Sequence, residues 1–201
     1  FARTRLLCLE NTQAGKAFGP DYFAAARALC DRLRLALHLD GARLFNAAEH
    51  QGCTVADMAR HCDSISICLS KSLGAPVGSV LAGPADFIEE ARRWRKMVGG
   101  GMRQAGVLAA AGIYALEHHV DRLSEDHGNA ARLGELVNER YPDTATSHTN
   151  MEFVDLPEAE MKALIERLKS RGVLIRGPRW VVHLDVSAED IERVGEALRS
   201  G

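Results

Sequence analysis

The chain has 201 residues, of which 46% are hydrophobic and 26% are charged, and its formal net charge is −2. This composition is ordinary for a globular protein with one large or two small domains. The charge gives no electrostatic case for nucleic acid or an anionic membrane as a partner, and no apolar stretch is long enough to span a bilayer.

The five cysteines are irregularly spaced, and Cys8 and Cys68 lie inside apolar runs. A free thiol in such surroundings behaves as a small hydrophobic group. We therefore expect all five to be reduced, which favours a cytoplasmic protein. We expect no metal site, because Cys-x-x-Cys is absent and the adjacent His118 and His119 cannot share one helix face.

Strands and helices alternate in the first half of the chain. Apolar runs predict strands, and apolar residues at helical spacing predict helices. In chain order we expect a strand at 5–9, a helix at 22–33, a strand at 35–39, a helix at 54–60, and strands at 64–69 and 77–82. This order is typical of βαβ units with a mostly parallel sheet. Since a strand comes almost at once and no methionine precedes it, we expect the chain to begin inside a domain.

After Gly83 the pattern changes to longer helices. A charged amphipathic helix is predicted at 84–97, then a break at 99–101, helical sequence from 102 to 140 and a polar linker at 142–149. A strand at 151–156, a helix at 158–171, strands at 173–175 and 181–184, and a helix at 188–198 with a cap signal at 186–187 complete the chain. We therefore predict a large-domain part (1–98), linking helices (99–141) and a smaller C-terminal α/β domain (142–201).

Lys71 directly follows the strand at 64–69 and precedes a turn rich in glycine and proline. Ligands bind at the carboxyl ends of the strands in open α/β sheets. A lysine amine that is partly desolvated at such a place can act as a nucleophile and form a Schiff base. Position alone favours the alternative of a lysine that reaches into solvent or binds an anion.

Asp40 ends the preceding strand, and Arg43 comes three residues later. The two opposite charges could simply neutralise each other. A carboxylate at this place could also keep the pyridine nitrogen of pyridoxal phosphate (PLP) protonated. A ribose-binding acid is a weaker alternative, because no G-x-G-x-x-G motif precedes Asp40. Asp40 and Arg43, followed by Ser70-Lys71 on the next strand, give the two-strand arrangement that a PLP site requires.

Five segments resemble the low-specificity L-threonine aldolases: LCLENT (7–12), LHLDGARLFNA (37–47), SICLSKSLGAPVGSVLAG (66–83), RKMVGGGMRQAGVLAAAGIYAL (95–116) and VVHLDVS (181–187). The resemblance covers nearly the whole chain. It implies an α/β protein of fold type I among the PLP enzymes, the aspartate-aminotransferase-like fold. It also implies an amino acid substrate and a homodimer or homotetramer.

The resemblance implies roles for particular residues. Lys71 would form the Schiff base with PLP, Asp40 would pair with the ring nitrogen, and Arg43 would lie beside the ring or the substrate. Arg179 would bind the substrate carboxylate, to which a guanidinium fork is suited; an exposed arginine at the start of a strand is the alternative. Basic residues supplied near the cofactor across a subunit interface would be Arg103 and Lys96.

The chain departs from the family in several places. Ser72 stands where glycine usually follows the lysine, and Gln13-Ala14 stand where His-Asn is usual. The stretch before Arg179 is shortened. The family's phosphate cradle, its ring-stacking histidine and its catalytic base would lie upstream of Phe1.

The reaction that the resemblance implies is the cleavage of threonine or allo-threonine to glycine and an aldehyde, with PLP as the electron sink. Two alternatives stay open. The chain could be a catalytically incomplete fragment that lacks the phosphate-binding part, or the reaction could be another PLP reaction, such as transamination or racemisation.

Overall fold

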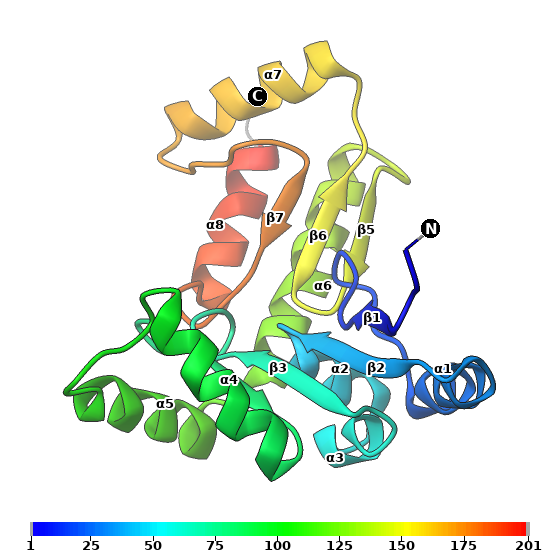
Figure 1. The fold of residues 1–201 in the computed structure, drawn as a ribbon. Coiled ribbons are helices and arrows are strands. Elements are labelled where there is room, and N and C mark those ends of the chain that lie inside the picture. Colours follow the sequence, from blue (N-terminus) through cyan, green and yellow to red (C-terminus); the bar gives the residue numbers. More distant parts are fainter. Residues whose placement is uncertain (1, 200–201) are drawn as a thin grey trace. The chain divides into compact units, whose positions relative to one another are not determined.

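The structure is a computed structural model that describes residues 2–199. The chain forms two compact units, of which the first ends at Asp121 and the second begins at Arg122 (Figure 1). The predicted division at 98 and 141 stays a prediction. Within residues 2–199, none of the helices combines the length and the apolar character needed to cross a bilayer.

The first unit is built around a four-stranded sheet in the order β1-β2-β3-β4. β1, β2 and β3 run parallel, and β4 pairs antiparallel with β3. The strands are β1 (Leu6–Glu10), β2 (Ala36–Gly41), β3 (Ser64–Cys68) and β4 (Ser79–Ala82). The predicted α/β class and mostly parallel sheet are therefore confirmed.

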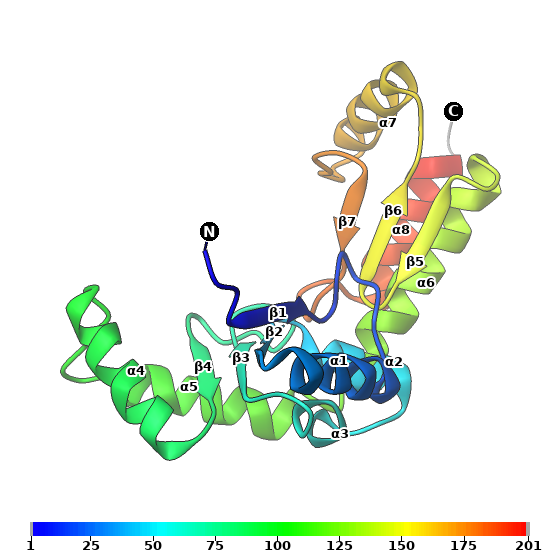
Figure 2. The same cartoon turned by 45° about the vertical axis from the view of Figure 1, so that its right-hand side comes forward.

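Three helices cover one face of this sheet (Figure 2). They are α1 (Pro20–Leu33), α2 (Leu44–Gln51) and α3 (Val55–Ala59). Their apolar side chains meet the inward residues of the strands in a core that contains Phe23, Leu39, Leu44 and Met58, all fully buried. Because the helices occupy only one side, the other face of the sheet stays open for polar side chains.

The helical sequence predicted from 102 to 140 forms two helices. α5 (Gly106–His118) ends in the first unit, and α6 (Leu123–Arg140) belongs to the second. α4 (Ala85–Met97) precedes them and has no buried residue. Hydrophobic spacing continues across the break, so periodicity alone does not reveal it.

The second unit contains an antiparallel sheet in the order β5-β6-β7, with α6 packed against β5, β6 and α8 (Figure 1). Its elements are β5 (Ala145–His148), β6 (Met151–Val154), α7 (Glu158–Ser170), β7 (Arg179–Val181) and α8 (Ala188–Arg199). A buried core that includes Leu136, Leu164, Trp180 and Ile191 joins the sheet to the helices. A smaller α/β unit at the carboxyl end was predicted.

Three local predictions in this unit are wrong. The segment predicted as a polar linker contains β5, an edge strand with the sequence Ala-Thr-Ser-His that pairs only with β6 within residues 2–199. Val173 and Ile175 pack against the core without joining a strand. The strand predicted at 181–184 is β7, which begins two residues earlier. The cap of α8 is confirmed, since Ser187 and Asp190 exchange hydrogen bonds between side chain and amide.

Glu152 of β6 is a fully buried carboxyl in the second unit. The Ser147 hydroxyl donates a hydrogen bond to Oε2, whereas Oε1 has no hydrogen-bond partner among residues 2–199. α6 can lie this close only because residue 134 is glycine, since a Cβ there would be 2.7 Å from Oε2. Burial raises the pKa of Glu152, against the effect of hydrogen bonds from Ser147 and the Phe153 amide.

We expect Glu152→Gln to raise the free energy of unfolding at neutral pH by on the order of 1 kcal/mol, because it removes a buried charge and keeps the shape. With a raised pKa in the folded state, Glu152 contributes stability below its unfolded pKa and loses it as the pH rises through the folded value. The advantage of the variant should therefore vanish on acidification towards pH ~4. Urea unfolding across this range measures it, with Glu160→Gln, an exposed glutamate of α7, as control. A difference that does not change with pH would contradict the expectation.

Candidate functional site

The open face of the first unit's sheet carries polar side chains near the carboxyl ends of its strands. Asp40 on β2 stands in register with Glu10 on β1 and with Ser66 on β3. Neighbouring residues of a strand point to opposite faces, and Leu39 and Ile65 pack on the helix-covered side. Asp40 and Ser66 therefore share the open face, where Asp40 is exposed.

Hydrogen bonds hold Asp40 and the loop beside it in place. Oδ1 of Asp40 accepts a hydrogen bond of 3.0 Å from the amide of Ala42. The Asn11 amide donates to the Asp40 carbonyl at 2.9 Å, and the Arg43 amide donates to the Asn11 carbonyl at 3.4 Å. Asn11 is fully buried, and its side chain exchanges hydrogen bonds with the backbone of Phe18. The turns after β1 and β2 are thus tied to each other.

Asn11 and Glu10 are site neighbours that sequence reasoning missed. Both belong to the segment quoted above for the family resemblance, where they follow the apolar run of β1. A polar residue that directly follows a buried strand was the signal used for Asp40. The same signal at Glu10 would have identified a second carboxylate at this edge of the sheet.

Lys71 lies in the loop between β3 and β4. The loop is shaped by backbone hydrogen bonds from Gly74 to the Lys71 carbonyl and from Ala75 to the Leu69 carbonyl, each 2.9 Å. Leu69, Leu73 and Ala75 are buried, whereas Lys71 is exposed. Among residues 2–199, no hydrogen bond or ion pair engages the Lys71 amino group, so this amine is accessible to a reactant.

Cys68 connects the Lys71 loop with the open face of the sheet. It ends β3 on the same face as Asp40, and its Sγ lies 3.4 Å from the Ser70 hydroxyl. Burial raises the pKa of the Cys68 thiol, but hydrogen bonds from Ser70 and the positive charge of Lys71 outweigh it and lower the pKa. The Lys71 loop therefore starts from a strand end on the face that carries Asp40.

The other predicted site residues lie at the start of α2, in the last turn of α4, in the loop that follows α4 and at the start of β7. Arg43 is half-buried at the amino end of α2, three residues after Asp40. Arg103 is exposed in the loop between α4 and α5, and no hydrogen bond or ion pair joins it to Lys71 or Asp40 in the described chain. Lys96 lies in the last turn of α4 and donates to the Gly101 carbonyl at 3.5 Å. Arg179 begins β7 of the second unit and is exposed. Its place in a shared site stays a prediction.

Residues 1–159 match the beta-eliminating lyase family. The chain belongs to this family. It is also 51% identical, over its whole length, to the low specificity L-threonine aldolase of Escherichia coli K12, of which it covers 61%. It is 40% identical over 95% of its length to the low-specificity L-threonine aldolase 1 of Arabidopsis thaliana, of which it covers 57%. The chain thus spans about three fifths of the length of these members of the family.

A solved threonine aldolase from Leishmania major resembles 97% of the chain with a TM-score of 0.81 at 22% identity, and the match covers 60% of that protein. An ornithine aminotransferase from Plasmodium falciparum matches with a TM-score of 0.63. These likenesses concern the fold, and they confirm the predicted fold type I. The beta-eliminating lyase family and its threonine aldolases depend on PLP.

The first unit supplies the two functional groups that PLP needs, a primary amine and a carboxylate. The cofactor's aldehyde needs a primary amine, and the Lys71 amine is exposed. Its ring nitrogen needs a carboxylate, and Asp40 lies one strand away with its orientation fixed by the Ala42 amide. In residues 2–199, no group of three or more histidine, cysteine, aspartate or glutamate side chains is arranged to hold a metal ion.

Proposed function

We propose that the chain carries the lysine and the carboxylate of a PLP-dependent aldehyde-lyase that cleaves threonine or allo-threonine to glycine and acetaldehyde. The observation that carries this proposal is the position of Asp40 near the carboxyl end of β2 and of Lys71 in the loop that follows β3, the parallel neighbour of β2. The identity of 51% with a low specificity L-threonine aldolase supports the same reaction.

When bound, PLP supplies an electron sink for the bond that breaks at the substrate's α-carbon. In the proposed reaction, the Lys71 amine would hold the cofactor through its aldehyde carbon. The Asp40 carboxylate keeps the proton on the ring nitrogen, which strengthens the sink. Arg43 flanks the ring or the substrate, and the guanidinium of Arg179 binds the substrate carboxylate by two parallel hydrogen bonds.

The proposal is tested by the formation of products from threonine. We would assay the 201-residue chain and a completed protein. The completed protein consists of this chain joined to the part of the Escherichia coli relative that the chain does not match. The completed protein should release acetaldehyde and glycine in equal amounts. Absence of both products from a folded, PLP-loaded completed protein would refute the proposal.

Two further outcomes separate the alternatives. If the chain alone neither binds PLP nor acts, whereas the completed protein does both, this chain is a catalytically incomplete part of the enzyme. If threonine and alanine instead yield keto acids or D-amino acids, the reaction is transamination or racemisation. The shared fold with an aminotransferase does not favour those reactions, because this fold serves many chemistries.

We also propose that the protein forms a homodimer or homotetramer. The support is a group of exposed apolar side chains on α4, α5 and the loop between them, where Val98 is 80% and Val107 83% exposed. Exposed apolar side chains that gather into a large patch mark protein–protein interfaces. The other large members of the group are Phe87, Trp94, Met97, Met102, Ile113, Tyr114 and Leu116.

Sedimentation is expected to show an oligomer that dissociates when Val98 and Val107 are both replaced by glutamate, because two buried charges would cost several kcal/mol. The control is Leu174→Glu, at a leucine of the second unit that is 79% exposed. A parent protein that sediments as a monomer at all concentrations would contradict the proposal. So would equal dissociation in the control.

The proposed compartment is the cytoplasm. All five cysteines are free in the structure. Free thiols are the usual state in a reducing compartment. Fractionation of cells that express the protein tests this assignment.

A further inference from the structure

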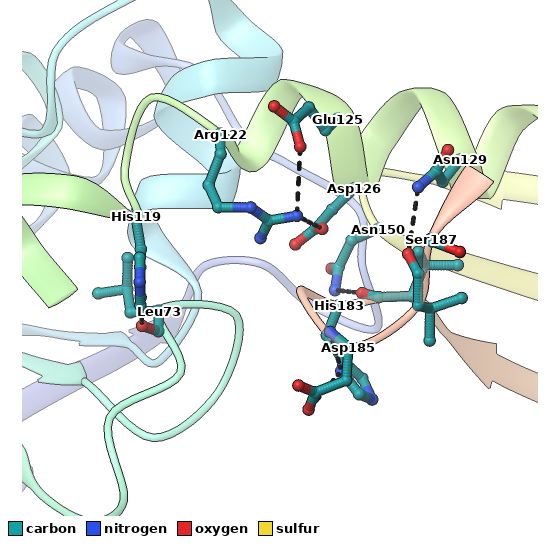
Figure 3. Close-up of polar contacts among 12 residues, drawn as sticks. Leu73, His119, Arg122, Glu125, Asp126, Asn129, Asn150, His183, Asp185 and Ser187 are labelled. Atoms are coloured by element: carbon teal, nitrogen blue, oxygen red, sulfur yellow. Dashed lines mark hydrogen bonds and ion pairs between the residues drawn. The ribbon is translucent and has the colours of Figure 1, made fainter. Parts of the chain in front are cut away.

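The loop that presents Lys71 is fastened to the carboxyl-terminal end of α5. His119, the residue that follows α5, places its Nδ1 atom 2.6 Å from the carbonyl oxygen of Leu73 (Figure 3). A carbonyl oxygen only accepts, so Nδ1 carries the proton and donates. This hydrogen bond links residues 46 positions apart in the chain.

The fastened carbonyl belongs to the same turn as the lysine. The turn starts at Lys71, whose carbonyl accepts a hydrogen bond of 2.9 Å from the Gly74 amide. Leu73 is its third residue and is only 3% exposed. Fixing the peptide plane after Leu73 therefore limits rotation within the turn, and with it the directions in which the Lys71 side chain can leave the backbone.

Packing between α5 and the loop supports the same contact. Gly112 on α5 is buried, and a Cβ atom there would lie 2.9 Å from Cδ1 of Leu69. The His119 ring also meets the edge of Tyr114, with ring centres 5.5 Å apart at 84°, and its amide bonds to the Ala115 carbonyl at 2.9 Å. Contacts with α5 thus fix the position of the imidazole whose Nδ1 binds the loop.

We propose that His119 is a positioning residue for Lys71, a role that rests on the proposed function of that lysine. The imidazole does not touch the reacting atoms. It acts through the Leu73 carbonyl and keeps the Lys71 turn in one conformation. The loop is therefore already ordered when the Lys71 amine meets the cofactor's aldehyde. Nδ1 can donate in both the neutral and the protonated ring, so the contact itself does not depend on the charge of the histidine.

Three substitutions of His119 separate the donor from the ring. His119→Phe keeps the ring and loses the donor, His119→Ala loses both, and His119→Asn restores an N–H donor on a shorter side chain. The matched control is His118→Phe at the adjacent exposed histidine, whose ring centre lies 4.3 Å from that of Tyr114. Thermal unfolding of each variant reports whether the fold as a whole is kept.

Two readouts apply to the 201-residue chain. Hydrogen exchange measures the protection of the Gly74 and Ala75 amides, which close the turn. Borohydride reduction after incubation with PLP, followed by peptide mass spectrometry, gives the initial rate at which the cofactor becomes attached to Lys71. Attachment to Lys16, Lys162 and Lys169 in the same sample is the internal reference.

We expect His119→Phe and His119→Ala to lower both the protection of these amides and the selectivity for Lys71 by about fivefold, which corresponds to one lost hydrogen bond. His119→Asn should recover most of each, and His118→Phe should match the parent. Amide exchange like that of the parent in His119→Phe and His119→Ala would overturn the proposal. So would an equal loss of protection in His118→Phe, or no recovery of protection in a folded His119→Asn. If Lys71 shows no preference in either the 201-residue parent or the completed protein, the proposed function fails, whereas the exchange result still decides the contact.

Discussion

Replacement of Lys71 by alanine should abolish threonine cleavage by the completed protein, with a fall in kcat of about three orders of magnitude or more. A primary amine is the group that forms a Schiff base with the cofactor's aldehyde, and Lys71 supplies that amine. Its exposed position after β3, without a hydrogen bond or ion pair in residues 2–199, gives it no structural task that would explain the same loss. Stability should therefore stay close to that of the parent.

Lys71→Arg distinguishes the chemistry of the amine from its charge. Arginine keeps the positive charge beside Cys68 but is not a nucleophile at neutral pH. It should lose activity as fully as alanine does. The assay is acetaldehyde release, with the absorbance spectrum of the cofactor and thermal unfolding as companion measurements.

The control for both variants is Lys162→Ala on α7, an exposed lysine whose amino group lies 2.6 Å from Glu158. It should keep parental activity and parental cofactor absorbance. Substantial activity in Lys71→Ala, or equal losses in all three variants, would remove Lys71 from the site.

The parts of the fold that could be predicted from the sequence are those where local pattern and tertiary packing agree. Leu37 and Leu39 are fully buried in β2, so the apolar run predicted that strand within two residues of its true ends. Asp40 lies near the carboxyl end of β2 and Lys71 follows β3 after two residues, and parallel strands end at the same edge of a sheet. The pairing of these two strands was therefore deducible before any coordinates.

Several features that escaped prediction depend on partners outside their own run of residues. β5 consists of Ala145-Thr146-Ser147-His148, which has no apolar alternation, and it is a strand because it pairs with β6. Glu152 has the residue type of an exposed position, yet the glycine at 134 lets α6 cover it. The contact between His119 and Leu73 joins a helix end to a loop. Local sequence patterns carry no information about such pairs.

Asp40→Asn is expected to lower kcat/KM for threonine about a hundredfold or more in the completed protein, because it removes a fixed charge aimed at the reacting system. Asparagine retains an oxygen that can accept the 3.0 Å hydrogen bond from the Ala42 amide. The substitution therefore changes the charge and leaves the orientation of the side chain as it was. It should also weaken PLP binding, which an absorbance titration measures.

Glu10→Gln is the matched comparison, because Glu10 stands in register with Asp40 on the same open face. β2 lies directly beside β3, the strand that leads to Lys71, whereas β1 is separated from β3 by β2. A ring held by Lys71 therefore meets the carboxylate of β2 first, and Glu10→Gln should cost less than about tenfold, since an exposed charge one strand further away is screened by solvent. A larger loss in Glu10→Gln than in Asp40→Asn would transfer the role at the ring nitrogen to the carboxylate of β1.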